Sequence, residues 1–144
     1  MAEFEGGLNL TEQGEGPIDE RAASLGKALL CARAAEQFKA RDLMLLNVSG
    51  LASFCDYFLI GSGQSSRQVQ GIADNVETTL RQSGIRPLGV EGKKEGHWIL
   101  MDYGDVIVHL FYEPVRHFYD LESLWSDAER IGWEESTSPV TTVS

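Results

Sequence analysis

Apolar residues recur with two different spacings along the first half of the chain, and these spacings predict a helix followed by two strands. From Asp19 to about Arg41 the apolar residues recur every three or four positions, which is typical of a helix with one buried face. The positions concerned are Leu25, Ala28, Leu29, Ala32, Ala35 and Phe38. Short apolar runs follow at residues 43–48 and 56–60, and we expect them to pair as a hairpin.

A second helix is expected directly after the second strand. Ser65 or Ser66 can cap its first turn, and Gly84 stands where a glycine often ends a helix. Between them one apolar stripe recurs at helical spacing, formed by Val69, Ile72, Ala73, Val76 and Leu80.

Three strands and a last helix complete the predicted domain. The strands are expected at residues 87–91, 97–102 and 105–112, and the first of them is the weakest. The helix begins near Pro114, and its stripe is interrupted near Asp120. That stripe contains Val115, Phe118, Leu121, Leu124, Trp125 and Ala128. The order predicts an α/β fold, with helices flanking a mixed sheet of about five strands.

The two ends of the chain lack this patterning. Residues 1–18 are rich in Gly and Glu, and residues 132–144 are rich in Ser and Thr, so we expect both to be disordered tails. The predicted domain is therefore residues 19–131.

The hairpin formed by the last two strands separates two kinds of side chain. With a two-residue turn at Tyr103-Gly104, Asp102 faces Asp105, Leu100 faces Ile107 and Trp98 faces His109. The apolar face consists of Ile99, Met101, Val106, Val108 and Leu110. The other face carries Trp98, Leu100, Asp102, Asp105, Ile107, His109 and Phe111. Spacing leaves open whether Trp98 is a core residue under a helix or an anchor in a docking patch.

The formal net charge of the 144-residue chain is −10, and the negative charge is unevenly distributed. Residues 91–127 contain eight acids and three bases, whereas residues 21–90 contain five acids and eight bases. The acidic segment fits either a basic partner or an ordinary solvated surface. The overall charge argues against binding to duplex DNA, which requires a basic face.

Candidate chemistry is sparse. The Gly61-Ser62-Gly63 turn before the second helix resembles a nucleotidyltransferase element, and Asp102 with Asp105 supplies the nearest carboxylate pair. The expectation is nevertheless no catalytic residue, no metal site and no cofactor, because no convergent set of ligands is visible. Cys31 and Cys55 are expected to be packing residues.

Composition also suggests where the protein works. No apolar run is long enough to span a membrane, and the acidic N-terminus is unlike a signal peptide. We expect a cytoplasmic protein with no membrane partner.

Several segments in unbroken order resemble the Iojap-like ribosomal silencing factors. They run from Asp56-Tyr57-Phe58 and Gly61-Ser62-Gly63 through residues 87–92 and 98–109 to residues 116–125, and the similarity covers about residues 22–128. The resemblance implies an α/β fold similar to nucleotidyltransferases but without their catalytic set.

The resemblance also implies a function. Members of this family repress translation, chiefly when nutrients are short, by binding the fourteenth protein of the large ribosomal subunit and blocking joining of the small subunit. It assigns Trp98 and Tyr119 to the docking face. Together with the strand-face pattern, we expect a partner-binding set of Trp98, Leu100, Asp102, Asp105, His109, Tyr119 and Glu122. Alternatives are a nucleotidyltransferase and a protein-binding adaptor unrelated to ribosomes. The sequence leaves open whether the free protein forms a homodimer.

Overall fold

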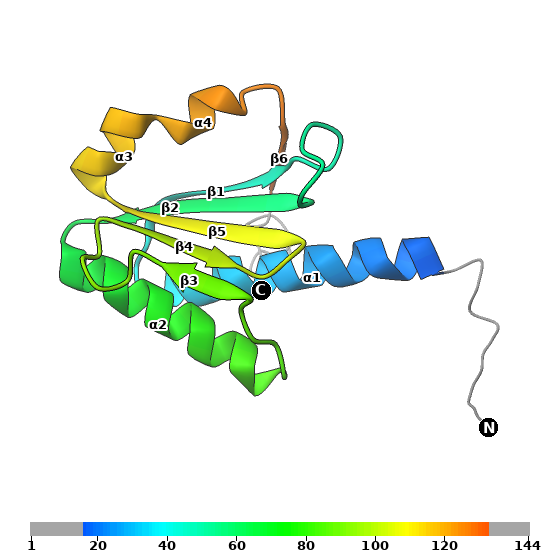
Figure 1. The fold of residues 1–144 in the computed structure, drawn as a ribbon, viewed down its shortest axis with the longest axis horizontal. Coiled ribbons are helices and arrows are strands. Elements are labelled where there is room, and N and C mark those ends of the chain that lie inside the picture. The colour runs from blue at the N-terminus through cyan, green and yellow to red at the C-terminus, as the bar shows by residue number, and fades with distance from the viewer. Residues whose placement is uncertain (1–15, 133–144) are drawn as a thin grey trace, which may run out of the picture.

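A computed structural model describes residues 16–132, which form one mixed sheet with helices on both faces (Figure 1). In chain order the elements are α1 (Gly16–Gln37), β1 (Arg41–Asn47), β2 (Tyr57–Gly63), α2 (Ser66–Gln82), β3 (Gly89–Glu91), β4 (Trp98–Asp102), β5 (Val106–Tyr112), α3 (Glu113–Tyr119), α4 (Leu121–Leu124) and β6 (Glu129–Ile131). The predicted α/β class is confirmed. The predicted tails at residues 1–15 and 133–144 lie outside the described residues.

The six strands lie in the order β3-β4-β5-β2-β1-β6. β2 and β5 are parallel, and every other neighbouring pair is antiparallel, including the predicted β1–β2 hairpin. β6 is the strand that the pattern did not predict. It has three residues and pairs with β1, about 85 positions earlier in the chain, so no local periodicity indicates it.

Helices α1 and α2 cover one face of the sheet, below it in Figure 1. The predicted stripe of α2 is buried at all five positions, and Ser65 is the residue that caps this helix. Gly84 follows the helix with φ +78°, the left-handed conformation that a glycine adopts without strain. The apolar face of the β4–β5 hairpin packs against these helices, as predicted.

Helices α3 and α4 lie over the other face of the sheet (Figure 1). The break expected near Asp120 is present, because Asp120 adopts φ 49° and separates the two short helices. Leu121 and Trp125 pack onto the sheet here, but Phe118 and Leu124 of the predicted stripe are 80% and 76% exposed. This second layer therefore covers its face of the sheet incompletely.

Two local predictions were wrong. Helix α1 begins at Gly16 rather than Asp19 and ends at Gln37, so that Arg41 already belongs to β1. Residues 16–18, which were predicted to be the end of the disordered tail, therefore belong to α1.

The register of the β4–β5 hairpin is also shifted by two residues. Asp102 lies opposite Ile107, Leu100 opposite His109, and Trp98 opposite Phe111. The turn consists of Gly104 and Asp105, since the N–H of Tyr103 donates to the carbonyl of Val106. A shift by two keeps the side chains of the paired residues on their predicted faces, because side chains alternate with a period of two. Asp105 is the exception, because it lies in the turn and its carboxylate binds α1.

Candidate functional site

An exposed aromatic surface lies between α3 and the start of β4; we define it as Trp98, Phe118 and Tyr119. The Trp98 ring lies 4.9 Å from the Tyr119 ring and 4.8 Å from the buried Phe111 ring, between ring centroids. Phe118 packs edge-on against Tyr119 at 5.0 Å. These side chains border a shallow, mainly apolar cavity of about 380 Å³, completed by His97, Pro114 and Val115. Trp98 is partly exposed at this surface and is not enclosed in the core.

This surface arises from local features of the sequence. Pro114 is accepted in the first turn of α3, and α3 then presents Phe118 and Tyr119 in its last turn. The left-handed Asp120 ends the helix there, so the two aromatic side chains stay at the edge of the layer. Phe118 was predicted only as part of a buried stripe. Periodicity marks which residues share a helix face, but it does not show that the face extends beyond the sheet.

His109 is the buried member of the predicted set, only 6% exposed. Its Nδ1 accepts a hydrogen bond of 3.2 Å from the indole Nε1–H of Trp98. Phe58 packs against the imidazole at 5.0 Å and nearly perpendicular to it. Burial lowers the pKa of His109 to about 4, so the imidazole is neutral at physiological pH.

Leu100 and Asp102 follow Trp98 on the same face of β4, and both are partly exposed. Oδ1 of Asp102 accepts a hydrogen bond of 2.8 Å from the backbone N–H of Gly104, which stabilises the turn. The side chain therefore lies at the end of the strand remote from Trp98.

Asp105 is not paired with Asp102 as expected. It lies in the turn and binds α1: Lys27 Nζ is 2.7 Å from one carboxylate oxygen, and the Ser24 hydroxyl donates to the other. Burial raises the pKa of Asp105, but the hydrogen bonds from Lys27 and Ser24 outweigh it and leave the pKa below its ordinary value. These contacts fasten the hairpin turn to α1.

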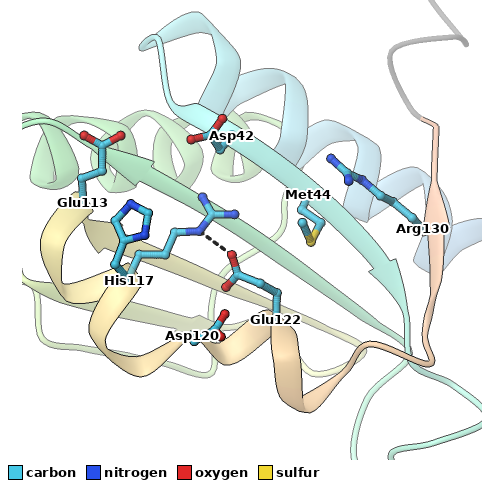
Figure 2. A pocket seen from close by; sticks show the side chains of 8 residues that line it. Asp42, Met44, Glu113, His117, Asp120, Glu122 and Arg130 are labelled. Atoms are coloured by element: carbon cyan, nitrogen blue, oxygen red, sulfur yellow. Dashed lines mark hydrogen bonds and ion pairs between the residues drawn. The ribbon is translucent and has the colours of Figure 1, made fainter.

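Glu122 forms an ion pair with the buried Arg116, with 3.0 Å between Oε2 and Nε. Figure 2 shows the cavity beside it, about 450 Å³ in volume, with Asp42 and Met44 on the β1 side and His117 and Asp120 on the helix side. Nη1 of Arg116 also donates to the Ser62 hydroxyl at 3.2 Å. Arg116 thus joins α3, α4 and β2. The sequence contained no direct sign that Arg116 is buried. Arg116 stands out only as one of three bases in the acidic segment of residues 91–127.

Gly61-Ser62-Gly63 was predicted as a turn, but these residues are the buried end of β2 and pair with β5. Ser62 is 1% exposed, and its hydroxyl also donates to the carbonyl of Arg41 at 3.2 Å. A hydroxyl with these two partners is not free to bind a phosphate, which weakens the nucleotidyltransferase alternative.

Both cysteines are buried, as expected for packing residues. Burial is the main cause that raises the pKa of each thiol to about 12, so neither is a thiolate at neutral pH. Within residues 16–132, no group of three or more His, Cys, Asp or Glu side chains could hold a metal ion. In the same part of the chain, no helix has the length and apolar character needed to cross a membrane.

The fold and this surface define a class: small α/β domains that expose aromatic side chains beside an open mixed sheet. A family model described as "Ribosomal silencing factor during starvation" matches residues 21–143. The chain belongs to this family, which gives it a ribosome-associated silencing role in translation.

Individual relatives agree with this assignment. The ribosomal silencing factor of Bacillus subtilis is 40% identical over 99 residues, which are 69% of this chain and 84% of the relative. The mouse protein named "Mitochondrial assembly of ribosomal large subunit protein 1" is 29% identical, over 77% of this chain and 50% of its own length. A crystal structure of a Chromobacterium violaceum protein superposes with a TM-score of 0.70 at 36% identity, covering 71% of this chain and 85% of the other.

Proposed function

We propose that this protein silences translation by docking on the large ribosomal subunit through its aromatic surface and so blocking joining of the small subunit. The partner is the fourteenth large-subunit protein, and the block operates chiefly when nutrients are short, in the cytoplasm. The action is steric and needs no chemical step. One observation carries the proposal: large apolar side chains stay exposed together around Trp98 in a chain of the silencing family.

The aromatic surface has the composition of a protein-binding site. Aromatic residues dominate binding energy at interfaces because they bury a large area with few rotatable bonds. Here Phe118 is 80% exposed and Tyr119 is 52% exposed, although both are apolar or amphipathic. Burying them against a partner removes this apolar area from water.

The net negative charge of the segment that carries the aromatic surface favours a basic partner. The strands and helices from residue 91 to residue 127 hold eight acids and three bases. We propose that Leu100 and Asp102 extend the contact along β4. A segment with net negative charge attracts a basic ribosomal protein during encounter, and its charged side chains help to fix the register. The mouse relative, whose name refers to assembly of the large ribosomal subunit, also favours that subunit as the target.

Sedimentation through sucrose gradients tests the proposal directly. Purified bacterial large subunits are mixed with small subunits, with and without the protein. We expect the protein to migrate with large subunits and to reduce the fraction of joined ribosomes. Comigration with small subunits alone, or unchanged joining at saturating protein, would contradict the proposal.

A matched pair of variants locates the surface. Phe118→Ala and Phe38→Ala remove the same atoms from two exposed phenylalanines. Phe38 follows the end of α1 and its ring lies beside Gly71 of α2, so it is on the opposite side of the sheet. Truncating an interface anchor costs about 2 kcal/mol or more, a factor of roughly 30 in affinity. We expect Phe118→Ala to weaken large-subunit binding by this order and Phe38→Ala to leave it unchanged.

A further inference from the structure

The polar edge of the Trp98 indole faces the sheet. Its Nε1–H donates to His109 Nδ1 across the β4–β5 pair. Trp98 lies directly opposite Phe111, and His109 lies opposite Leu100, so the two bonded residues are diagonal neighbours on one sheet face. The hydrogen bond therefore ties the indole to β5 at one defined edge.

The chemistry of His109 fixes the direction of this hydrogen bond. An indole nitrogen is only a donor, so Nδ1 of His109 must be the acceptor and the imidazole proton resides on Nε2. The neutral imidazole required for this arrangement is the form that burial favours. A protonated His109 would carry hydrogens on both nitrogens and could not accept the indole N–H.

The burial of His109 separates its role from that of its neighbours. The side chain is 6% exposed and is covered by Phe58, so a docked partner cannot reach it. Trp98, in contrast, is partly exposed and is bounded by Phe111 and Tyr119 on its other sides. Any effect of His109 on docking must therefore pass through the indole that it holds.

We propose that His109 is a positioning residue that sets the orientation of the Trp98 indole and occupies the only hydrogen-bond donor of that side chain. The inference rests on the proposed function, because it assumes that Trp98 contacts the ribosomal partner. It also defines what the partner must offer. Trp98 meets the partner as a hydrocarbon surface, which suits the aliphatic stem of a lysine or arginine and does not suit a hydrogen-bond acceptor.

Two substitutions at position 109 isolate the hydrogen bond. His109→Asn keeps an acceptor on Cγ, because Oδ1 of asparagine takes the position of Nδ1. His109→Leu has the same number and branching of side-chain heavy atoms as asparagine but no acceptor. Circular dichroism and a thermal melt confirm that each variant is folded before it is compared.

The hydrogen bond is read from the indole N–H itself by nitrogen-15 NMR. Of the three tryptophans in the chain, Trp98 is assigned through the resonance that disappears in Trp98→Phe. We expect the Trp98 N–H to be protected from solvent exchange in the free wild-type protein and in His109→Asn, and to lose protection in His109→Leu. Exchange of the wild-type indole at the rate of an exposed tryptophan overturns the proposal without any variant at position 109.

Binding to purified large subunits then tests the consequence. Contacting residues are typically coupled strongly enough to change affinity by roughly tenfold. We therefore expect His109→Leu to weaken binding to large subunits by about that factor. His109→Asn should retain most of the wild-type affinity. Trp98→Phe combined with His109→Leu should bind no more weakly than Trp98→Phe alone. Unchanged binding in His109→Leu despite a deprotected indole, or fully additive losses in the double variant, overturns the positioning role.

The two proposals fail in different ways. If the wild-type protein does not bind large subunits, the proposed function fails, and the NMR measurement still decides whether His109 holds the indole. If the wild type binds and the indole is free, only the positioning role fails.

Discussion

Replacing Glu122 with alanine should destabilise the fold strongly, because it leaves the Arg116 guanidinium buried without its counter-charge. Arg116 is 6% exposed, and its remaining hydrogen-bond partners are uncharged: the Ser62 hydroxyl at 3.2 Å and the Arg41 carbonyl at 3.4 Å. Breaking a buried ion pair by removing one partner costs about 3–5 kcal/mol. The Glu122 side chain is 26% exposed, so water replaces part of the lost interaction, and we expect about 3 kcal/mol.

Glu113→Ala supplies the matched control from the rim of the same cavity. Glu113 lies 4.0 Å from Arg41, whose side chain is 53% exposed, and exposed pairs of this kind contribute about 0–1 kcal/mol. Urea unfolding at pH 7 measures both variants. We expect the free energy of unfolding to fall by about 3 kcal/mol in Glu122→Ala, or roughly 10 °C in melting temperature. Glu113→Ala should change little.

The double variant Arg116→Met, Glu122→Leu completes the test. It removes both charges and fills the space with apolar side chains, so it should recover much of the stability lost in Glu122→Ala. Equal losses in the two alanine variants, or a double variant less stable than Glu122→Ala, would refute the reasoning. The result also bears on function, because Glu122 then acts on the docking surface by holding α3 and α4 in place.

Further outcomes are expected from the same contacts. Between pH 6.5 and about 4 the unfolded chain binds a proton at His109 that the folded chain does not. The free energy of unfolding therefore falls as pH is lowered through this window, by up to about 3 kcal/mol. Urea melts of His109→Asn should lack this pH dependence. The pKa of Asp105 is lower in the folded protein than its ordinary value of 3.8, so its ionised carboxylate stabilises the fold above that pH, and this stabilisation is lost as pH falls further. Asp105→Asn should therefore reduce the pH dependence of the free energy of unfolding only at the acidic end. Gly92→Ala should destabilise by about 2 kcal/mol or more in urea, because Gly92 has φ +82° and a Cβ there would overlap the Trp98 carbonyl oxygen. Asp102→Lys should slow association with large subunits in stopped-flow measurements at low salt and reduce the salt dependence of the rate, while dissociation changes less.

The parts of the fold that local physics determines were predictable from the sequence. Helix α2 is an example, because its cap at Ser65, its stripe and its glycine stop all lie within one stretch of chain. The faces of the β4–β5 hairpin were predictable for the same reason, since alternation needs no knowledge of the partner strand. The register was not, because it depends on which two residues form the turn, and Gly104-Asp105 competed with Tyr103-Gly104.

The candidate site was predictable in part. Trp98, Leu100 and Asp102 lie on the predicted sheet face, but spacing alone left Trp98 between core and surface. Its partial exposure depends on where α3 ends over the sheet, and that position is a tertiary property. Asp105 was also not predictable from its neighbours in sequence. They indicated a pair with Asp102, whereas its partners Lys27 and Ser24 come from α1, far away in the chain.

The sheet is open, and its two outermost strands are very short. β3 and β6 have three residues each, and charged side chains stand on them: Glu91 on one edge, Glu129 and Arg130 on the other. An unpaired strand edge is a template on which another chain can add a strand and begin a fibril. A short edge strand has few free backbone groups with which an added strand could pair. Its charged side chains also make the approach of another strand unfavourable. The protein can therefore expose apolar side chains on α3 for recognition while its sheet resists the edge-to-edge growth that leads to amyloid.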